Sequence, residues 1–305
     1  MAAHSGGRLM EALRGHSAAR THDVSTIAAN TPPYDIPHTP DDFLSGESGT
    51  VGGLDGLRRG TVDLSADALD LVSTRRLRLK LAAHDSPPRR RVLVIGVARP
   101  EHRALVEDIR RELARSRHEV KVCLRAPGSA GKFENLNLLL DAHPPERYDW
   151  VLVVDDDIVL PRGFLDRFLF LAERFRLDLA QPAQRASSHA AWRVTRRRPR
   201  SAVRETRFVE IGPVTAFARS TFSTLLPFPD LRMGWGLDLH WAALAREHHW
   251  RCGILDAVSI AHRAAPAASA YSREQALTEA RSFLEHRAYL SASEAQQTLV
   301  THRRW

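Results

Sequence analysis

Short apolar runs alternate with segments of helical periodicity from Arg89 onward. Three β-branched, apolar runs are typical of buried strands: RVLVIGVA, HEVKVCLRA and YDWVLVVDDD. Three segments between and after them carry apolar residues at helical spacing: PEHRALVEDIRRELARS, KFENLNLLLDAH and FLDRFLFLAERF. The alternation predicts βαβ units, and therefore an α/β fold with a mainly parallel, Rossmann-like sheet that helices cover on both faces.

The first 88 residues follow a different pattern. Residues 27–60 are rich in Pro, Gly, Asp and Ser without a sustained period, which predicts an extended or partly disordered arm. A short amphipathic helix is expected next, with Ser65 as its candidate N-cap, followed by the linker HDSPPRRR. We therefore expect an N-terminal arm over residues 1–88 and a compact domain over residues 89–305.

Composition narrows the class of protein. With 43% hydrophobic and 26% charged residues, the chain is expected to be mostly globular. Its apolar runs are far shorter than the roughly 20 residues that span a bilayer. The first residues lack the apolar centre of a secretory signal, so the cytoplasm is the expected compartment and any membrane contact would be peripheral. Cys123 and Cys252 lie in apolar segments, where buried reduced thiols are expected.

The formal net charge of +8 leaves nucleic acid, an anionic membrane surface or an anionic small substrate open as partners. Arginines cluster in PPRRR and in RVTRRRPRSAVRETR, without interleaved aromatic residues or a nucleic-acid motif. We interpret these clusters as solvated loops, with a phosphate-facing loop as the alternative, and expect no nucleic-acid partner.

Three adjacent carboxylates, Asp155, Asp156 and Asp157, follow the third predicted strand. Neighbouring carboxylates repel one another unless a cation or hydrogen bonds compensate them. Ligands of open α/β sheets bind at the carboxyl ends of the strands, and Mg²⁺ and Mn²⁺ prefer oxygen ligands. Because strand side chains alternate between faces, Asp155 and Asp157 should share one side. The pattern predicts a divalent-cation site; a solvated turn or a helix cap is the alternative.

These residues resemble a known family. VLVVDDDIVLP is similar to the Asp-x-Asp (DXD) segment of GT-A fold glycosyltransferases, particularly the family 2-like enzymes that use nucleotide-diphosphate sugars. Three further segments follow the family order: GKFENLNLLL resembles its Lys-x-x-x-Leu-Asn helix, MGWGLDLHWA its Gly-Trp-Gly-x-Asp segment, and SIAHRAAP its late metal-binding His. The resemblance covers residues 89–262. VLVIGVARPEH departs from it, because the usual Pro-x-Tyr-Asn opening is absent.

The resemblance implies roles for the matched positions. The ligands of Mn²⁺ or Mg²⁺ would be Asp155, Asp157 and His262. The residues that contact the nucleotide-sugar donor would be Lys132, Asn135, Asn137 and Asp155. With the opening motif absent, the candidates for nucleobase contacts at the end of the first strand are Arg99 and Glu101.

The acceptor side is expected around the Gly-Trp-Gly segment. Glycines on both sides of Trp235 allow a sharp turn that leaves the ring free to line a sugar site, so Trp235 and Gly236 are candidate acceptor contacts. RFVEIGPVTAFARSTFSTL resembles the acceptor-side strand of the family, which makes Glu210 a further candidate. Asp238 begins a predicted helix, whose macrodipole favours the ionised carboxylate, and it is our candidate general base. The alternatives are that Asp238 only caps its helix, that Trp235 only packs, and that Glu210 faces solvent.

The sequence as a whole predicts a metal-dependent glycosyltransferase of the hexosyltransferase class. It would transfer a sugar from a nucleotide-diphosphate sugar to a saccharide or other hydroxyl acceptor, with inversion if Asp238 is the base. A haloacid dehalogenase-like phosphohydrolase is one alternative, although it requires Asp-x-Asp near the first strand. A non-catalytic basic binding protein is another, and salt dependence without a need for divalent cation would identify it. The donor, the acceptor and the oligomeric state stay open.

Overall fold

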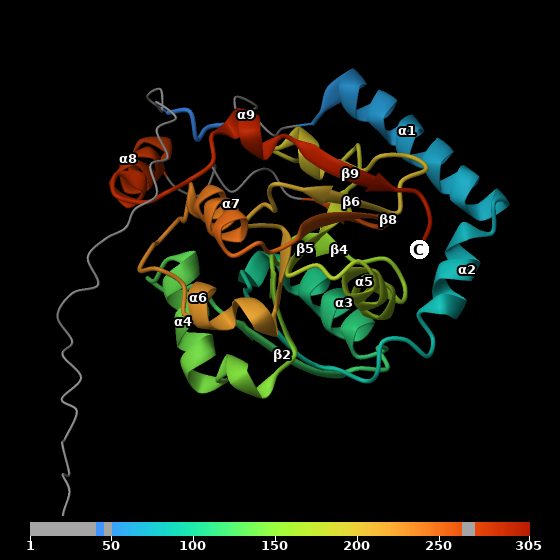
Figure 1. Ribbon diagram of the computed structural model, residues 1–305, viewed down its shortest axis with the longest axis horizontal. Coiled ribbons are helices and arrows are strands. Elements are labelled where there is room, and N and C mark those ends of the chain that lie inside the picture. Colours follow the sequence, from blue (N-terminus) through green and yellow to red (C-terminus); the bar gives the residue numbers. More distant parts are fainter. Residues whose placement is uncertain (1–40, 46–50, 264–271) are drawn as a thin grey trace, which may run out of the picture. The chain divides into compact units, whose positions relative to one another are not determined.

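The computed structural model describes residues 41–45, 51–263 and 272–305 (Figure 1). All of them belong to one compact unit, His38–Trp305. The part of the predicted arm before residue 41 lies outside the described residues. In the described part of the chain, no helix is both long enough and apolar enough to span a membrane.

A single mixed sheet forms the centre of this unit. Within the described residues eight strands follow the order β2-β1-β3-β7-β5-β8-β6-β9, and a ninth, β4, pairs with β8. The strands are β1 (Arg91–Val97), β2 (Glu119–Arg125), β3 (Trp150–Val154), β4 (Ile158–Val159), β5 (Leu179–Gln184), β6 (Val203–Thr206), β7 (Val214–Ala218), β8 (Cys252–His262) and β9 (Thr298–His302).

The strand directions correct the prediction of a mainly parallel sheet. β1 is parallel to β2 and β3, and β5 is parallel to β8. However, β7 is antiparallel to both β3 and β5, and β6 is antiparallel to both β8 and β9. The regular alternation of strand and helix stops after β5, and only residues 207–213 join β6 to β7. A parallel βαβ unit requires a crossover connection, usually a helix, and the short link from β6 to β7 provides none; these two strands are not neighbours in the sheet.

Helices cover both faces of the sheet, as the sequence predicts, and Figure 1 shows α4 and α7 on one side and α3 and α5 on the other. The pleat explains the division: Leu93 and Ile95 of β1 join one buried cluster, and Val92 and Val94 join the other. The first cluster includes residues of α4 (Lys132–Ala142), α6 (Phe222–Leu225), α7 (Leu237–Glu247), α8 (Arg273–Leu284) and α9 (Ala292–Ala295). The second includes residues of α2 (Arg75–Ala82), α3 (Arg103–Leu113) and α5 (Phe164–Arg174).

Helix α1 (Gly53–Val72) is longer than the short helix expected from the sequence. It begins within the segment interpreted as extended, and Ser65 lies inside it rather than at its N-cap. Several of its apolar side chains are exposed, but the carboxylate of Asp63 is buried and accepts hydrogen bonds from the backbone N–H groups of Ala186 and Ser187. Polar contacts thus attach α1 to the rest of the domain.

Two arginines of the RVTRRRPRSAVRETR segment are structural rather than solvated. Arg197 donates hydrogen bonds to Asp67 and Asp70 of α1, each at 2.6 Å. Arg204 is fully buried against Asp256, with 2.8 Å between Nε and Oδ2, and also donates to two main-chain carbonyl groups. A buried ion pair needs such additional hydrogen bonds to offset its desolvation. These two side chains are therefore already engaged by carboxylates of the protein.

Candidate functional site

The acidic triplet lies at the carboxyl end of β3, where the chain turns into the short strand β4. β3 ends at Val154, and Asp156 and Asp157 form the turn. β4 then pairs antiparallel with the end of β8, with Ile158 opposite His262. This long-range pairing places His262 beside Asp157. The triplet follows β3 and does not continue it. The alternation of side chains along a strand therefore does not explain why its three side chains point in different directions.

One candidate cation site combines Asp155, Asp157 and His262. Each offers one ligand atom, and these atoms lie within 4.8 Å of one another. His262 Nδ1 lies 3.2 Å from the carbonyl oxygen of His189, which can only accept, so Nδ1 carries the proton. The second ring nitrogen, Nε2, is then directed to Asp157 Oδ1 at 3.0 Å.

Asp157 Oδ1 supports a cation at this position. The atom is buried and lies 3.0 Å from His262 Nε2, and it has no hydrogen-bond partner within the described residues. A buried carboxylate oxygen without a hydrogen bond is costly. Two carboxylates and an imidazole are a suitable donor set for Mn²⁺, and the carboxylates for Mg²⁺. The residues present therefore fit a divalent cation.

Electrostatics favour the charged forms of both members of the Asp157–His262 contact. Burial opposes ionisation of Asp157, but His262 outweighs it and holds the pKa of the carboxyl below its usual value. Burial likewise opposes a charged His262, but Asp157 and then Asp155 raise the pKa of the imidazole. A cation and a proton compete for His262 Nε2, so cation binding should strengthen as pH rises.

Asp156 has a different set of partners. It accepts hydrogen bonds from the backbone N–H of Arg99 at 2.6 Å and from Arg99 Nη2 at 2.6 Å, and His102 Nδ1 lies 3.0 Å away. Burial opposes ionisation, but these hydrogen bonds hold the pKa of Asp156 below its usual value. His102, Asp156 and Asp157 form a second set with ligand atoms within 4.8 Å. Arg99 contacts both carboxylates of this second set, whereas Lys132 contacts only one carboxylate of the first, so the second set is the poorer cation site.

The predicted nucleobase contacts of Arg99 and Glu101 lie beside this group. Arg99 is engaged with Asp156, which raises the pKa of its guanidinium, and it also reaches Asp157 at 3.3 Å. Glu101 is exposed in a short turn of 3-10 helix, Pro100–His102. Sequence reasoning did not find His102, because nothing in the local pattern distinguishes it from a surface histidine.

Lys132, at the start of α4, contacts the triplet directly. Its Nζ donates to Asp155 Oδ1 at 2.6 Å, and its backbone N–H donates to the carbonyl of Arg232 at 2.7 Å. Gly131 and Gly212 permit this packing: a Cβ at Gly131 would overlap the backbone of Arg232, and one at Gly212 would lie 2.8 Å from Asp155 Oδ2. The protein thus places a cationic side chain on the predicted metal ligand Asp155.

The two asparagines of α4 hold loops in place. Asn135 is fully buried, and its Nδ2 lies within 3.0 Å of three carbonyl oxygens in the loop before α4. Asn137 donates to the carbonyl of Phe228 and accepts from its N–H, both at 2.9 Å. Apart from the buried Oδ1 of Asn135, the amide atoms of both side chains already have partners. The predicted nucleotide contacts would require these hydrogen bonds to break.

The Gly-Trp-Gly segment forms a tight loop before α7. Gly234 and Gly236 have φ values of 81° and 83°, and a Cβ at Gly234 would overlap the ring of Phe133. Only glycine adopts this conformation and approach without strain. Trp235 is half-buried and packs against the core, as the packing alternative expected, with part of its surface still accessible.

A residue of α8 that sequence reasoning missed holds this loop. The carboxylate of Glu279 accepts hydrogen bonds from three successive backbone N–H groups, those of Arg232, Met233 and Gly234, at 2.7–3.0 Å. Successive N–H groups directed to one carboxylate form an anion-binding concavity. No local sequence signal links Glu279 to a loop so distant along the chain.

Asp238 and Glu210 are two acids with raised pKa values. Asp238, at the start of α7, is 5% exposed, and burial raises its pKa to about 7 although the N–H of Leu239 donates to it. The expectation that the macrodipole keeps Asp238 ionised is therefore corrected, because burial is the stronger effect. Burial and the neighbouring Asp238 raise the pKa of Glu210 to about 8. Glu210 does not face solvent freely: Gln184 Nε2 donates to it at 2.6 Å.

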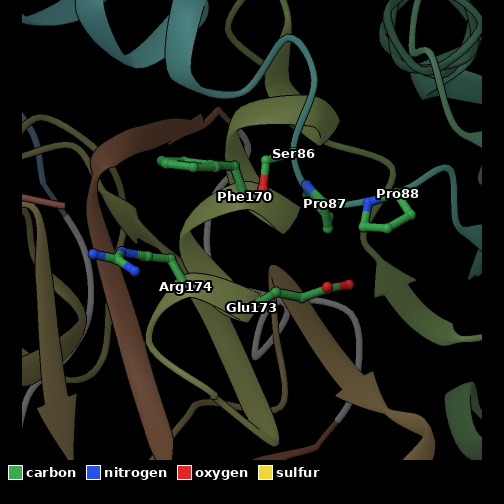
Figure 2. A pocket seen from close by; sticks show the side chains of 6 residues that line it. All are labelled: Ser86, Pro87, Pro88, Phe170, Glu173 and Arg174. Atoms are coloured by element: carbon green, nitrogen blue, oxygen red, sulfur yellow. The ribbon is translucent and has the colours of Figure 1, made fainter.

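A pocket of about 230 Å³ lies at the opposite end of β1 and is lined by Ser86, Pro87, Pro88, Phe170, Glu173 and Arg174. Figure 2 shows Glu173 extending beneath the two prolines while Arg174 points away. Glu173 already pairs with Arg90 at 2.7 Å. The pocket flanks the amino end of the strand, whereas ligands of such sheets bind at the carboxyl ends, so it is not our candidate active site.

Replacing Glu279 by Gln should destabilise the domain by about 1–2 kcal/mol, because three N–H groups would lose a charged acceptor. Urea unfolding measures this change. Glu285→Gln, at the exposed end of the same helix, is the matched control and should stay within about 0.5 kcal/mol of the wild type. Equal stabilities of the two variants would show that the Glu279 contacts do not hold the loop.

Comparison with known proteins gives limited similarity. No protein-family model matches the chain, and a search of curated proteins found no match. Solved structures that resemble it include the STIV protein A197, with 16% identity and a TM-score of 0.38 over 57% of this chain and 86% of that one. They also include GalNAc-T7 with UDP, GalNAc and Mn²⁺, with 10% identity and a TM-score of 0.38 over 56% of this chain and 43% of that one. At these TM-scores the comparisons do not assign the chain to a family.

Proposed function

We propose that this protein is a metal-dependent glycosyltransferase that uses a nucleotide-diphosphate sugar and an acceptor with a hydroxyl group. The observation that carries the proposal is the grouping of Asp155, Asp157 and His262 at the carboxyl end of β3, where the buried Asp157 Oδ1 lies 3.0 Å from His262 Nε2 and has no hydrogen bond within the described residues. Their identity and order, with Asp238 between the triplet and His262 in the chain, support the GT-A resemblance found in the sequence.

The donor side is proposed to lie at the acidic triplet. Asp155, Asp157 and His262 would hold Mn²⁺ or Mg²⁺. When bound, such a cation neutralises the charge that develops on the departing nucleotide diphosphate. Lys132 Nζ, now on Asp155, would be released to the diphosphate once the carboxylate has another positive partner.

Asp238 is proposed to act on the acceptor. A base works best when its pKa is near the working pH, and a pKa of about 7 meets that condition. The ionised carboxylate would take the proton of the acceptor hydroxyl as its oxygen attacks the anomeric carbon, which gives inversion. Trp235, Gly236 and Glu210 are proposed to contact the acceptor, with Glu279 fixing the loop that carries the first two.

Two alternatives fit the structure less well. A haloacid dehalogenase-like phosphohydrolase needs its Asp-x-Asp after the first strand of its sheet, but here the triplet follows β3 and Arg99 lies just beyond β1. A purely basic binding protein does not account for two buried or half-buried carboxylates and a histidine whose ligand atoms lie within 4.8 Å of one another. The catalytic domain is proposed to be residues 89–305, with α1 and α2 attached to it.

Thermal unfolding with UDP, GDP, dTDP or CDP, each with and without Mn²⁺, tests the proposal. A ligand that binds only the folded state raises Tm. At a free ligand concentration of one hundred times Kd, it stabilises the folded state by about 2.7 kcal/mol. We expect one nucleotide to raise Tm more with Mn²⁺ present than without it. If no nucleotide gave a larger rise in Tm with Mn²⁺ than without it, the transferase would be rejected, and a response to salt alone would favour the binding protein.

A further inference from the structure

A second pocket, of about 360 Å³, contains none of the residues of the acidic site. It lies between α1, α2, the loop after Arg197 and the residues that follow β9. Seven arginines line it: Arg75, Arg78, Arg197, Arg198, Arg200, Arg303 and Arg304.

The carboxylates near these arginines are already neutralised. Asp70 pairs with Arg197 at 2.6 Å, and Asp256 pairs with the fully buried Arg204 behind the pocket wall at 2.8 Å. In contrast, five lining arginines form no ion pair with any described residue: Arg78, Arg198, Arg200, Arg303 and Arg304. The pocket therefore has an excess of positive charge.

The arginines also crowd one another. Burial lowers the pKa of Arg198, and Arg204 lowers it further. Burial likewise lowers the pKa of Arg75, to which Arg197 and Arg78 add, although Asp70 and Asp256 oppose them. Arg75 is held in place from outside by stacking over the ring of Trp305 at 5.7 Å and by a hydrogen bond to the carbonyl of Arg303. An anion in the pocket would relieve this repulsion.

We propose that this pocket is a second, metal-independent binding site for a phosphate-bearing anion of the size of a diphosphate group. Guanidinium groups match phosphate oxygens with paired hydrogen bonds, whereas a chloride ion offers only a point charge. Arg198 and Arg200 on the loop and Arg78 on α2 supply donors from two separate elements. Among the lining residues there is no aromatic platform of the type that stacks nucleic-acid bases, so a compact anion fits better.

Isothermal titration of the full-length protein with pyrophosphate, in EDTA and at constant ionic strength set with chloride, tests the site. The wild type should bind, and the Arg198→Gln, Arg200→Gln double variant should bind about tenfold more weakly or worse, since each charged hydrogen bond contributes substantially. The matched control carries Arg58→Gln and Arg147→Gln, two exposed arginines outside the pocket, and should bind like the wild type.

Three further measurements complete the test. Asp157→Ala should leave pyrophosphate binding in EDTA unchanged, which separates this site from the proposed catalytic one. Vesicles of phosphatidylcholine with phosphatidic acid, compared with phosphatidylcholine alone, distinguish a lipid headgroup from a soluble diphosphate. The double variant should lose binding to whichever of these two ligands the wild type binds. Arg78→Gln, on another element, should also weaken binding. Equal affinities of the wild type and the double variant, or no binding in either arm, would overturn the proposal.

Discussion

Asp157→Asn should abolish the Mn²⁺-dependent rise in Tm with nucleotide and reduce sugar transfer on the order of 10²- to 10³-fold. The side chain is buried, ionised and directed to His262, and its Oδ1 has no hydrogen bond in the described structure. An amide is a weaker cation ligand than a carboxylate, and it leaves the site one negative charge short. Titration of Mn²⁺ by electron paramagnetic resonance measures affinity without activity.

The two possible ligand sets make the matched variants informative. Asp155→Asn and His262→Ala each remove a ligand from the proposed set, whereas Asp156→Asn and His102→Ala affect only the other one. We expect the first pair to lose Mn²⁺ affinity and the second pair to retain it. Asp156→Asn should still lower Tm, because Arg99 loses its closest partner. The opposite ranking of affinities would move the cation to His102 and Asp156.

Asp238→Asn should lower sugar transfer by about 10²- to 10⁴-fold and at the same time stabilise the protein above pH 7. The folded pKa of about 7 lies above the ordinary value of 3.8, so the folded state binds more protons than the unfolded state between these values. The contribution of this carboxyl to the stability of the folded state is fully present below about pH 4 and is lost as the pH rises through 7. Asn does not ionise. The free energy of unfolding of the variant should therefore exceed that of the wild type by on the order of 2–4 kcal/mol at pH 8 and by little at pH 4.

Two measurements check this pair of effects. Urea unfolding at pH 4 and pH 8 gives the change in stability, with Asp141→Asn, an exposed aspartate of α4, as the control without pH-dependent gain. The pH profile of kcat/KM should fall on the acid side near pH 7, because protonated Asp238 cannot accept the hydroxyl proton. If Asp238→Asn stabilises the protein at pH 8 but keeps full activity, Asp238 is a strained structural residue and another group is the base.

The sequence by itself determined the local elements and the position of the acidic segment. Apolar runs and helical spacing specify β1, β2, β3, α3, α4 and α5 directly, because each periodicity reflects which side of one element is buried. The same patterns placed three carboxylates at the end of β3 and marked Gly234 and Gly236, whose positive φ values require glycine. These features depend on a few neighbouring residues, which is the information that a local pattern contains.

Only the tertiary structure decided how these elements combine. Insertion of β7 between β3 and β5 makes the sheet mixed, and pairing of β4 with β8 brings His262 to Asp157. Long-range contacts also engage Lys132 with Asp155. Burial, rather than position in the helix, sets the pKa of Asp238. Each of these depends on residues distant in the sequence and on desolvation, which no local period records.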